Sequence, residues 1–127
     1  VEANEAADEF TFNATSGTIT KYTGNSSVVE IPEELNGFKV LAIGSSAFAG
    51  NSTLTEIVIP DTVTTIDFRA FWDCTSLTRI TIPASVTKID STAFEGCKKD
   101  KLVWVVTPGS YAETYAKKNY YHYVYAK

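Results

Sequence analysis

A repeat of 23 residues is the feature that most restricts how this chain can fold. The landmarks that define the repeat recur as Ile59-Pro60 and Ile82-Pro83, Ala70-Phe71 and Ala93-Phe94, and Cys74 and Cys97. The apolar positions between them repeat in step, matching Leu54, Ile57, Ile59, Val63 and Ile66 to Leu77, Ile80, Ile82, Val86 and Ile89. Such a repeat predicts a solenoid, in which each coil lays a strand beside its neighbour and buries a shared apolar column.

Two further units are less regular. An earlier unit begins at Ile31-Pro32 and is stretched by five residues, Glu34 to Phe38, before Ala47-Phe48 restores the register. A last, partial unit follows Cys97, where the spacing from Leu102 to Pro108 equals that from Leu77 to Pro83. The sequence therefore predicts about three and a half coils.

A single coil can be assigned from its residue types. Residues 54–59 are rich in β-branched side chains, so they predict a strand that ends at Pro60, which cannot donate to a ladder. Residues 63–66 predict a second extended segment, and residues 68–72 predict a helical or 3₁₀ turn that points Ala70 and Phe71 inward. The phenylalanines of successive coils should then form one buried column, made of Phe48, Phe71 and Phe94. Across the strands, Glu56 should form an ion pair with Arg79.

The pattern Leu-x-x-Ile-x-Ile-Pro-x-x-Val-Thr-x-Ile-x-x-x-Ala-Phe-x-x-Cys resembles the BspA-like, or Treponema-type, leucine-rich repeat family. The resemblance covers Val28 to Pro108, and the flanking segments 22–24 and 110–113 are similar to those of the family. Asp67 and Asp90 depart from it, because they stand where the family often has glycine. The resemblance implies an α/β solenoid, a short leucine-rich-repeat horseshoe, in a secreted or cell-surface bacterial protein that serves recognition or adhesion.

The rest of the chain predicts caps within one domain. Residues 1–9 carry four acids and no periodicity, as a flexible leader or tether would, and Val1 in place of Met suggests a trimmed, exported chain. Residues 10–27 predict an N-terminal hairpin cap, residues 28–108 the repeats and residues 109–127 a C-terminal cap. In this last segment, Ser110 and Glu113 form a capping box for a helix to about Asn119, and Tyr120 to Tyr125 predicts an edge strand.

Composition argues against several classes of function. A net charge of -4 and a pI near 4.9 disfavour a nucleic-acid binder, and no apolar run is long enough for a membrane span. The single histidine, His122, has no catalytic motif around it, so we expect no enzyme, no metal and no cofactor. Cys74 and Cys97 lie one coil apart, and we expect free, buried thiols in preference to a bridge.

Residues that interrupt the repeat are the candidates for ligand contacts, because coil packing does not require them. Phe68 replaces Ser45 and Ser91, and Trp72 replaces Ala49 and Glu95, with Arg69 between them. Trp104 is expected at an outward strand position, on the same face as Thr81. The candidate ligand-binding residues are therefore Phe68, Arg69, Trp72, Trp104 and Thr81. The alternatives are that Phe68 and Trp72 pack on each other or on the longer first coil, and that the C-terminal cap covers Trp104.

We therefore expect a non-catalytic, extracellular module that binds a protein, such as a host matrix protein or another cell-surface protein, through a rigid repeat surface. A polysaccharide partner, bound as in a carbohydrate-binding module by exposed Trp or Tyr, is the first alternative. The second alternative is a structural spacer or assembly unit that pairs through the edge strand Tyr120 to Tyr125. The expected state is a monomer, with edge-strand pairing as the exception.

Overall fold

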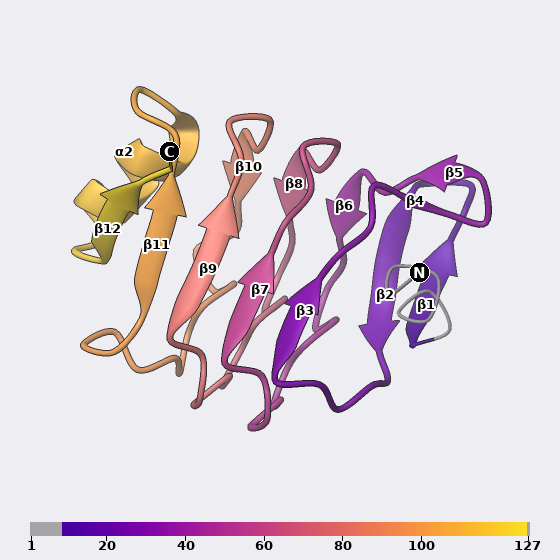
Figure 1. Cartoon of the computed structure of the whole chain (residues 1–127), viewed down its shortest axis with the longest axis horizontal. Helices are drawn as coiled ribbons and strands as arrows, with labels where there is room; N and C mark the ends of the chain where they lie inside the picture. The colour runs from indigo at the N-terminus through magenta and orange to yellow at the C-terminus, as the bar shows by residue number, and fades with distance from the viewer. Residues whose placement is uncertain (1–8, 127) are drawn as a thin grey trace.

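The first three coils each contribute one short strand to each of two sheets, which run along the length of the solenoid (Figure 1). The fourth coil adds strands to the second sheet alone and has a helix in place of a strand in the first. The computed structural model describes residues 9–126; except for Glu9, the predicted leader at 1–9 lies outside them. The first sheet has the order β1-β2-β6-β8-β10, with β1 (Phe10–Asn13), β2 (Thr18–Tyr22), β6 (Ala42–Ile43), β8 (Thr65–Ile66) and β10 (Lys88–Ile89). The second sheet has the order β12-β11-β9-β7-β3, with β12 (His122–Tyr125), β11 (Val103–Val106), β9 (Arg79–Ile82), β7 (Glu56–Val58) and β3 (Val28–Glu30).

The strand register reproduces the sequence repeat. Neighbouring coils pair in parallel, so that Ile57 of β7 lies opposite Ile80 of β9 in the second sheet. In the first sheet, Ile66 of β8 lies opposite Ile89 of β10. The solenoid has about five turns at a spacing of about 23 residues, so its fold class is the predicted one while its number of turns exceeds the predicted three and a half.

Glu56 and Arg79 are neighbours in this register, but the predicted ion pair between them is wrong. Among residues 9–126, the only salt bridge joins the Lys117 ammonium to the Glu113 carboxylate at 3.6 Å. Glu56 and Arg79 are both exposed, where the Coulomb attraction in water is too weak to hold two flexible side chains in one geometry.

The core contains a column of aromatic rings. Phe48, Phe71 and Phe94 are buried and stacked as predicted, with ring centroids 5.0 Å apart for the first pair and 5.1 Å for the second. Beside the rings, the backbone amides of Phe48 and Phe71 donate to the carbonyl oxygens of Ala70 and Ala93, at 2.8 and 2.7 Å. These bonds form a third backbone connection between coils, on the side that we call the turn side.

The segment around Phe71 is not the helical or 3₁₀ turn that the sequence predicts. The Ala70 amide donates to Asp67 and the Trp72 amide to Arg69, at 3.1 and 3.0 Å, so these residues form separate single turns. The Phe71 amide between them donates to the neighbouring coil instead. Because alternate amides are used between coils, a continuous helical hydrogen-bond pattern cannot form.

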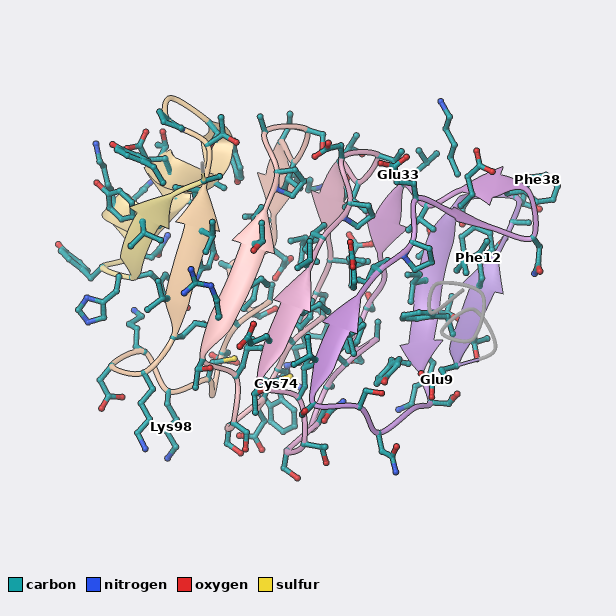
Figure 2. The ribbon with its side chains drawn as sticks, in the orientation of Figure 1. Glu9, Phe12, Glu33, Phe38, Cys74 and Lys98 are labelled. Atoms are coloured by element: carbon teal, nitrogen blue, oxygen red, sulfur yellow. The ribbon has the colours of Figure 1, made fainter. Side chains whose placement is uncertain are left out.

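Two hairpins occupy the N-terminal end. Strands β1 and β2 pair antiparallel, which is the predicted cap. The five extra residues of the first coil belong to a second hairpin, made of β4 (Glu34–Leu35) and β5 (Phe38–Lys39). Asn36 and Gly37 join its strands at φ values of 55° and 84°, the conformation of a type I′ turn. Figure 2 shows Phe38 projecting from this end of the molecule, and its side chain is 54% exposed.

The C-terminal cap begins with helix α2 (Tyr111–Lys118), whose N-cap is Ser110 as predicted. The Ser110 hydroxyl accepts from the Glu113 amide at 3.1 Å. The Glu113 carboxylate accepts from the Gly109 amide at 2.7 Å, one residue before the amide that a standard capping box would use. No helix in the described part of the chain is long and apolar enough to cross a membrane.

A left-handed residue ends helix α2 and directs the chain into β12. After the C-cap Asn119, Tyr120 has a φ of 64°. The Tyr121 amide donates back to the Ala116 carbonyl oxygen at 2.9 Å, and the Tyr120 amide donates to Lys117 at 3.3 Å. This is the hydrogen-bond pattern of a Schellman motif, with tyrosine in the position that usually holds glycine.

Candidate functional site

The structure brings Phe68, Arg69 and Trp72 together on the turn side of the second coil. The central carbon of the Arg69 guanidinium lies 5.0 Å from the Phe68 ring centroid and 5.4 Å from that of Trp72. Both distances are within the range of cation–π attraction. Phe68 is 47% exposed and Trp72 is 37% exposed, so solvent reaches both rings. We call these three residues the aromatic-arginine cluster.

Backbone bonds to the coils on both sides fix the cluster in place. Arg69 has a φ of 52°, and its amide donates to the hydroxyl of Thr92 in the next coil at 3.1 Å. The Thr92 hydroxyl and amide in turn donate to the Asp90 carboxylate, and these two bonds hold the pKa of Asp90 below its usual range. On the other side, the Trp72 carbonyl oxygen accepts from the Gly50 amide at 2.7 Å. The cluster is therefore presented by a well-connected backbone.

Coil packing does not account for the two exposed rings. Phe71 lies between Phe68 and Trp72 in the sequence and is fully buried, as its equivalents in the other coils are. The positions of Phe68 and Trp72 are filled in the neighbouring coils by small or polar residues, namely Ser45 and Ser91, and Ala49 and Glu95. Since those coils pack normally without the rings, the cluster is an addition to the scaffold.

The predicted surface position of Trp104 is wrong. Trp104 is fully buried, and its ring centroid lies 4.9 Å from that of Phe94, 4.8 Å from Tyr121 and 5.5 Å from Tyr115. It therefore extends the aromatic column under the C-terminal cap, and no surface ligand can reach it.

A register shift in the fourth coil explains this burial. Aligning Leu102 with Leu77 places Trp104 opposite Arg79, but β11 pairs with β9 so that Trp104 lies opposite Ile80. The coil is one residue shorter between Leu102 and Val103 than the repeat implies. A shift of one residue turns every following strand side chain to the other face.

Thr81 lies apart from the cluster. It is half-buried on β9, in the second sheet, with Val58 opposite it on β7. The cluster follows β8, which belongs to the first sheet. The structure thus groups three of the five predicted site residues and separates Thr81 and Trp104 from them.

A pocket beside helix α2 was not predicted from the sequence. This cavity has a volume of about 360 Å³ and is lined by Ser91, Tyr111, Thr114, Tyr115, Lys118 and Asn119. Tyr111 presents a partly exposed ring, while Lys118 brings an ammonium group and Ser91 a hydroxyl. The i, i+3, i+4, i+7 spacing of residues 111, 114, 115 and 118 was the available signal, because it places them on one helix face.

Tyr125 ties the edge strand to helix α2. Its hydroxyl donates to the Glu113 carboxylate, which also accepts from Gly109 and faces Lys117. The bond from Tyr125, followed by that from Gly109, holds the pKa of Glu113 below its usual range. The same Tyr125–Glu113 bond raises the pKa of Tyr125 to about 12.

The two cysteines are free, and Cys74 lies inside the coil (Figure 2). Their sulfur atoms lie 3.1 and 3.2 Å from the carbonyl oxygens of Phe48 and Phe71, so each thiol donates to the preceding coil. Interaction with Cys97, together with burial, raises the pKa of the Cys74 thiol. The same interaction lowers the pKa of Cys97, which is only half-buried.

The described residues contain no grouping of three or more His, Cys, Asp or Glu side chains that could hold a metal ion. His122, the single histidine of the chain, is exposed on β12.

Known structures share this solenoid. A T. pallidum leucine-rich repeat protein is 26% identical with a TM-score of 0.68, and the match covers 81% of this chain and 53% of that one. A leucine rich cell surface protein from Faecalibacterium prausnitzii is 38% identical with a TM-score of 0.65, covering 77% and 29%. A Bacteroides ovatus leucine-rich repeat protein is 27% identical with a TM-score of 0.55, covering 77% and 35%. The chain thus spans about half or less of the length of these structures.

Sequence comparison gives the family. No curated protein matched the chain. The model of the BspA type leucine rich repeat region matches residues 41–116, in 6 copies, which is more than half of the chain. The chain belongs to the BspA-type leucine-rich repeat family.

Proposed function

We propose that this chain is a non-catalytic recognition module that acts outside the cell and binds a protein through the aromatic-arginine cluster. The observation that carries the proposal is the exposure of the Phe68 and Trp72 rings on either side of Arg69. Tryptophan and arginine are enriched among the residues that dominate binding energy at protein interfaces. A repeat protein also offers a rigid surface for such residues.

Preorganisation makes the cluster suited to recognition. Arg69 already lies over two rings, and its backbone is tied to Thr92, so little side-chain or backbone freedom remains to be lost on binding. The rings leave the in-plane N–H groups of the guanidinium free to donate to a carboxylate. A partner segment that carries an acidic residue beside an apolar side chain matches this arrangement.

An extracellular location and a role in adhesion belong to the same proposal. Support comes from the Faecalibacterium prausnitzii structure, which is described as a leucine rich cell surface protein. The partner classes are a host matrix protein and a surface protein of another cell. Antibody labelling of intact and lysed source cells tests the location: signal on intact cells or in the medium agrees, and signal only after lysis contradicts it.

A variant that copies the first coil tests the binding site. Phe68→Ser combined with Trp72→Ala reproduces Ser45 and Ala49, so the second coil should pack as the first one does. Purified matrix proteins and bacterial surface proteins are arrayed and probed with wild type, this double variant and Phe38→Ser, which removes an exposed ring elsewhere. We expect the double variant to lose binding by about 30-fold or more and Phe38→Ser to keep it.

A carbohydrate-binding role is the second candidate, and the pocket beside α2 favours it. A sugar ring can stack on Tyr111 while Ser91 and Lys118 contact its hydroxyl or carboxylate groups. A glycan array probed with wild type and Lys118→Ala tests this role. Binding that depends on Lys118 and survives the Phe68→Ser, Trp72→Ala change supports it, and the absence of glycan binding contradicts it.

A further inference from the structure

At the C-terminal end of the solenoid, the described residues cover the outer edge of the first sheet and leave that of the second sheet unpaired. In the first sheet the last strand is β10, where the Tyr111 hydroxyl accepts from the Ile89 amide at 3.3 Å and the Tyr115 hydroxyl donates to the Asp90 carbonyl oxygen at 3.2 Å. Helix α2 thereby satisfies edge groups of that sheet. In the second sheet the last strand is β12, and no other strand of residues 9–126 pairs with its outer edge.

The groups that β12 presents to this open edge can be identified. The Ala126 amide donates to the Val106 carbonyl oxygen of β11 at 2.8 Å. Successive residues of a strand direct their N–H and C=O groups to opposite sides, so His122, Val124 and Ala126 face β11. Tyr123 and Tyr125 therefore direct both of their backbone groups away from β11. Nothing in β12 blunts this edge, because it holds no proline, lysine or bulge.

We propose that β12 is a self-association surface, through which two copies of this chain pair antiparallel about a two-fold axis at Val124. In this register Tyr123 of each copy lies opposite Tyr125 of the other. These are the residues whose backbone groups point outward, and facing residues of a hydrogen-bonded pair exchange both N–H···O bonds. The two open edges thus satisfy each other and join two five-stranded sheets into one continuous sheet.

A two-fold axis at Tyr123 is disfavoured, because it would need a backbone amide that already donates a hydrogen bond within the chain. Centring the axis on Tyr123 would require Tyr121 to pair with Tyr125 of the second copy. The Tyr121 amide already donates to the Ala116 carbonyl oxygen at 2.9 Å, which closes helix α2. The Val124 register pairs, on both copies, backbone groups of described residues that point away from β11.

Side chains agree with a second copy as the occupant. Val124 is 45% exposed and would face its own equivalent across the axis, which forms an apolar contact on the outer face. On the other face, Tyr123 would pair with Tyr125 of the second copy, and aromatic cross-strand pairs are stabilising. The self-complementary order of side chains in β12 fits an isologous two-fold contact.

The charges near β12 determine how salt should act. Lys117 and Lys118 lie in the last turn of α2, and Lys99 lies over the Tyr121 ring at 4.7 Å. The two-fold contact brings two such basic ends together, so they repel. Added salt screens this repulsion and should strengthen the pairing.

Sedimentation velocity on the 127-residue chain tests the proposal first. We expect a dimer whose fraction rises with protein concentration and with added sodium chloride. A monomer at every concentration up to the solubility limit overturns the proposal, and so does a species that bypasses the dimer for higher oligomers.

A cysteine placed on the axis tests the register. In the proposed contact, Val124 forms a non-hydrogen-bonded pair with its equivalent at a Cα separation of about 4.5 Å, which a disulfide can bridge. Val124→Cys should therefore cross-link rapidly with oxidised glutathione. Tyr120→Cys is the control, because Tyr120 is 85% exposed but lies off the two-fold axis. Both variants retain Cys74 and Cys97, so any background cross-linking through the native cysteines is the same in each. Equal cross-linking rates for the two variants overturn the register.

A pair of variants at Tyr125 separates the backbone from the side chain. Tyr125→Pro removes the outward N–H and the ring, whereas Tyr125→Ala removes only the ring. We expect the dissociation constant of Tyr125→Pro to exceed that of Tyr125→Ala by about 10-fold, because two symmetry-related hydrogen bonds are lost. Equal constants for the two folded variants contradict pairing through this edge. The Val124→Cys measurement decides the case if the proline variant does not fold.

Discussion

Phe71 lies parallel to Phe94 in the next coil, with ring centroids 5.1 Å apart and 6° between the ring planes. Both rings are buried, while Phe68 and Trp72 in the same turn as Phe71 are exposed. In this turn, Phe71 packs between coils, whereas Phe68 and Trp72 form part of the surface. Stability and recognition should respond to different substitutions.

Substitutions in this turn separate the two roles. Phe71→Ala should lower the free energy of unfolding by about 3–5 kcal/mol, because it leaves a cavity in the stacked column. Phe68→Ala should cost about 1 kcal/mol or less, since its ring is exposed and contributes mainly the contact with Arg69. Urea denaturation followed by circular dichroism measures both values. Similar losses for the two variants would show that the column does not hold the coils together.

The end of helix α2 offers a stabilising substitution. Tyr120 is 85% exposed and has a φ of 64°, a conformation that costs a non-glycine residue about 1 kcal/mol or more. Tyr120→Gly should raise the free energy of unfolding by about 1 kcal/mol. Tyr120→Ala keeps the strain and serves as the control. A destabilised glycine variant, relative to alanine, would contradict the Schellman geometry.

The Tyr125–Glu113 bond should make stability depend on pH at both ends of the scale. The folded state raises the pKa of Tyr125 to about 12, so the unfolded chain loses this proton first and stability falls as the pH rises through that range. The folded pKa of Glu113 is lowered, so its contribution is present above the ordinary carboxyl pKa and is lost as the pH falls through the folded value.

Tyr125→Phe removes the Tyr125–Glu113 hydrogen bond. The free energy of unfolding should therefore depend less on pH, at both the acidic and the alkaline end of the scale. Urea midpoints measured across the pH range, with nuclear magnetic resonance titration of the Glu113 carboxyl carbon, test this expectation. The Glu113 pKa should move up toward the ordinary value in the variant. An unchanged titration would mean that Gly109 and Lys117 alone set that pKa.

The cysteines should differ in reactivity. Cys97 is half-buried with a lowered pKa, whereas Cys74 is fully buried with a raised one. The thiolate is the nucleophile, so iodoacetamide should label Cys97 first at neutral pH. Peptide mass spectrometry of the native chain measures the order. Equal labelling, or Cys74 ahead of Cys97, contradicts the assigned environments.

Most of the fold could be predicted from the sequence, because residues that recur at the repeat spacing are the ones that each coil buries. Phe48, Phe71 and Phe94 recur with their alanines, and every coil must bury the same positions. The two caps could also be predicted. Ser110 and Glu113 have the three-residue spacing of a capping box, and residues 10–22 have the composition of two strands joined by a turn. In these segments, the local capping and turn residues and the 23-residue repeat predict the same structure.

Predictions that depend on register or tertiary contact are less accurate. The repeat spacing of Leu102 and Pro108 predicts an outward Trp104, and nothing local reveals the one-residue shortening after Leu102. The pocket joins Ser91 to a helix face that begins at Tyr111, and no pattern within either segment indicates that contact. The exposed cluster could be found because Phe68 and Trp72 interrupt an otherwise regular repeat.

If the aromatic-arginine cluster is the binding site, a bound protein should reduce the accessibility of Trp72 to a quencher. In Trp104→Phe, Trp72 is the only tryptophan; the change should be tolerated, since the buried Trp104 indole N–H has no hydrogen-bond partner among the described residues. Acrylamide should quench the free variant strongly, because Trp72 is 37% exposed. Saturation with a protein identified on the array should then shield Trp72 and lower the quenching constant. Unchanged quenching in a fully formed complex would show that recognition takes place elsewhere on the solenoid.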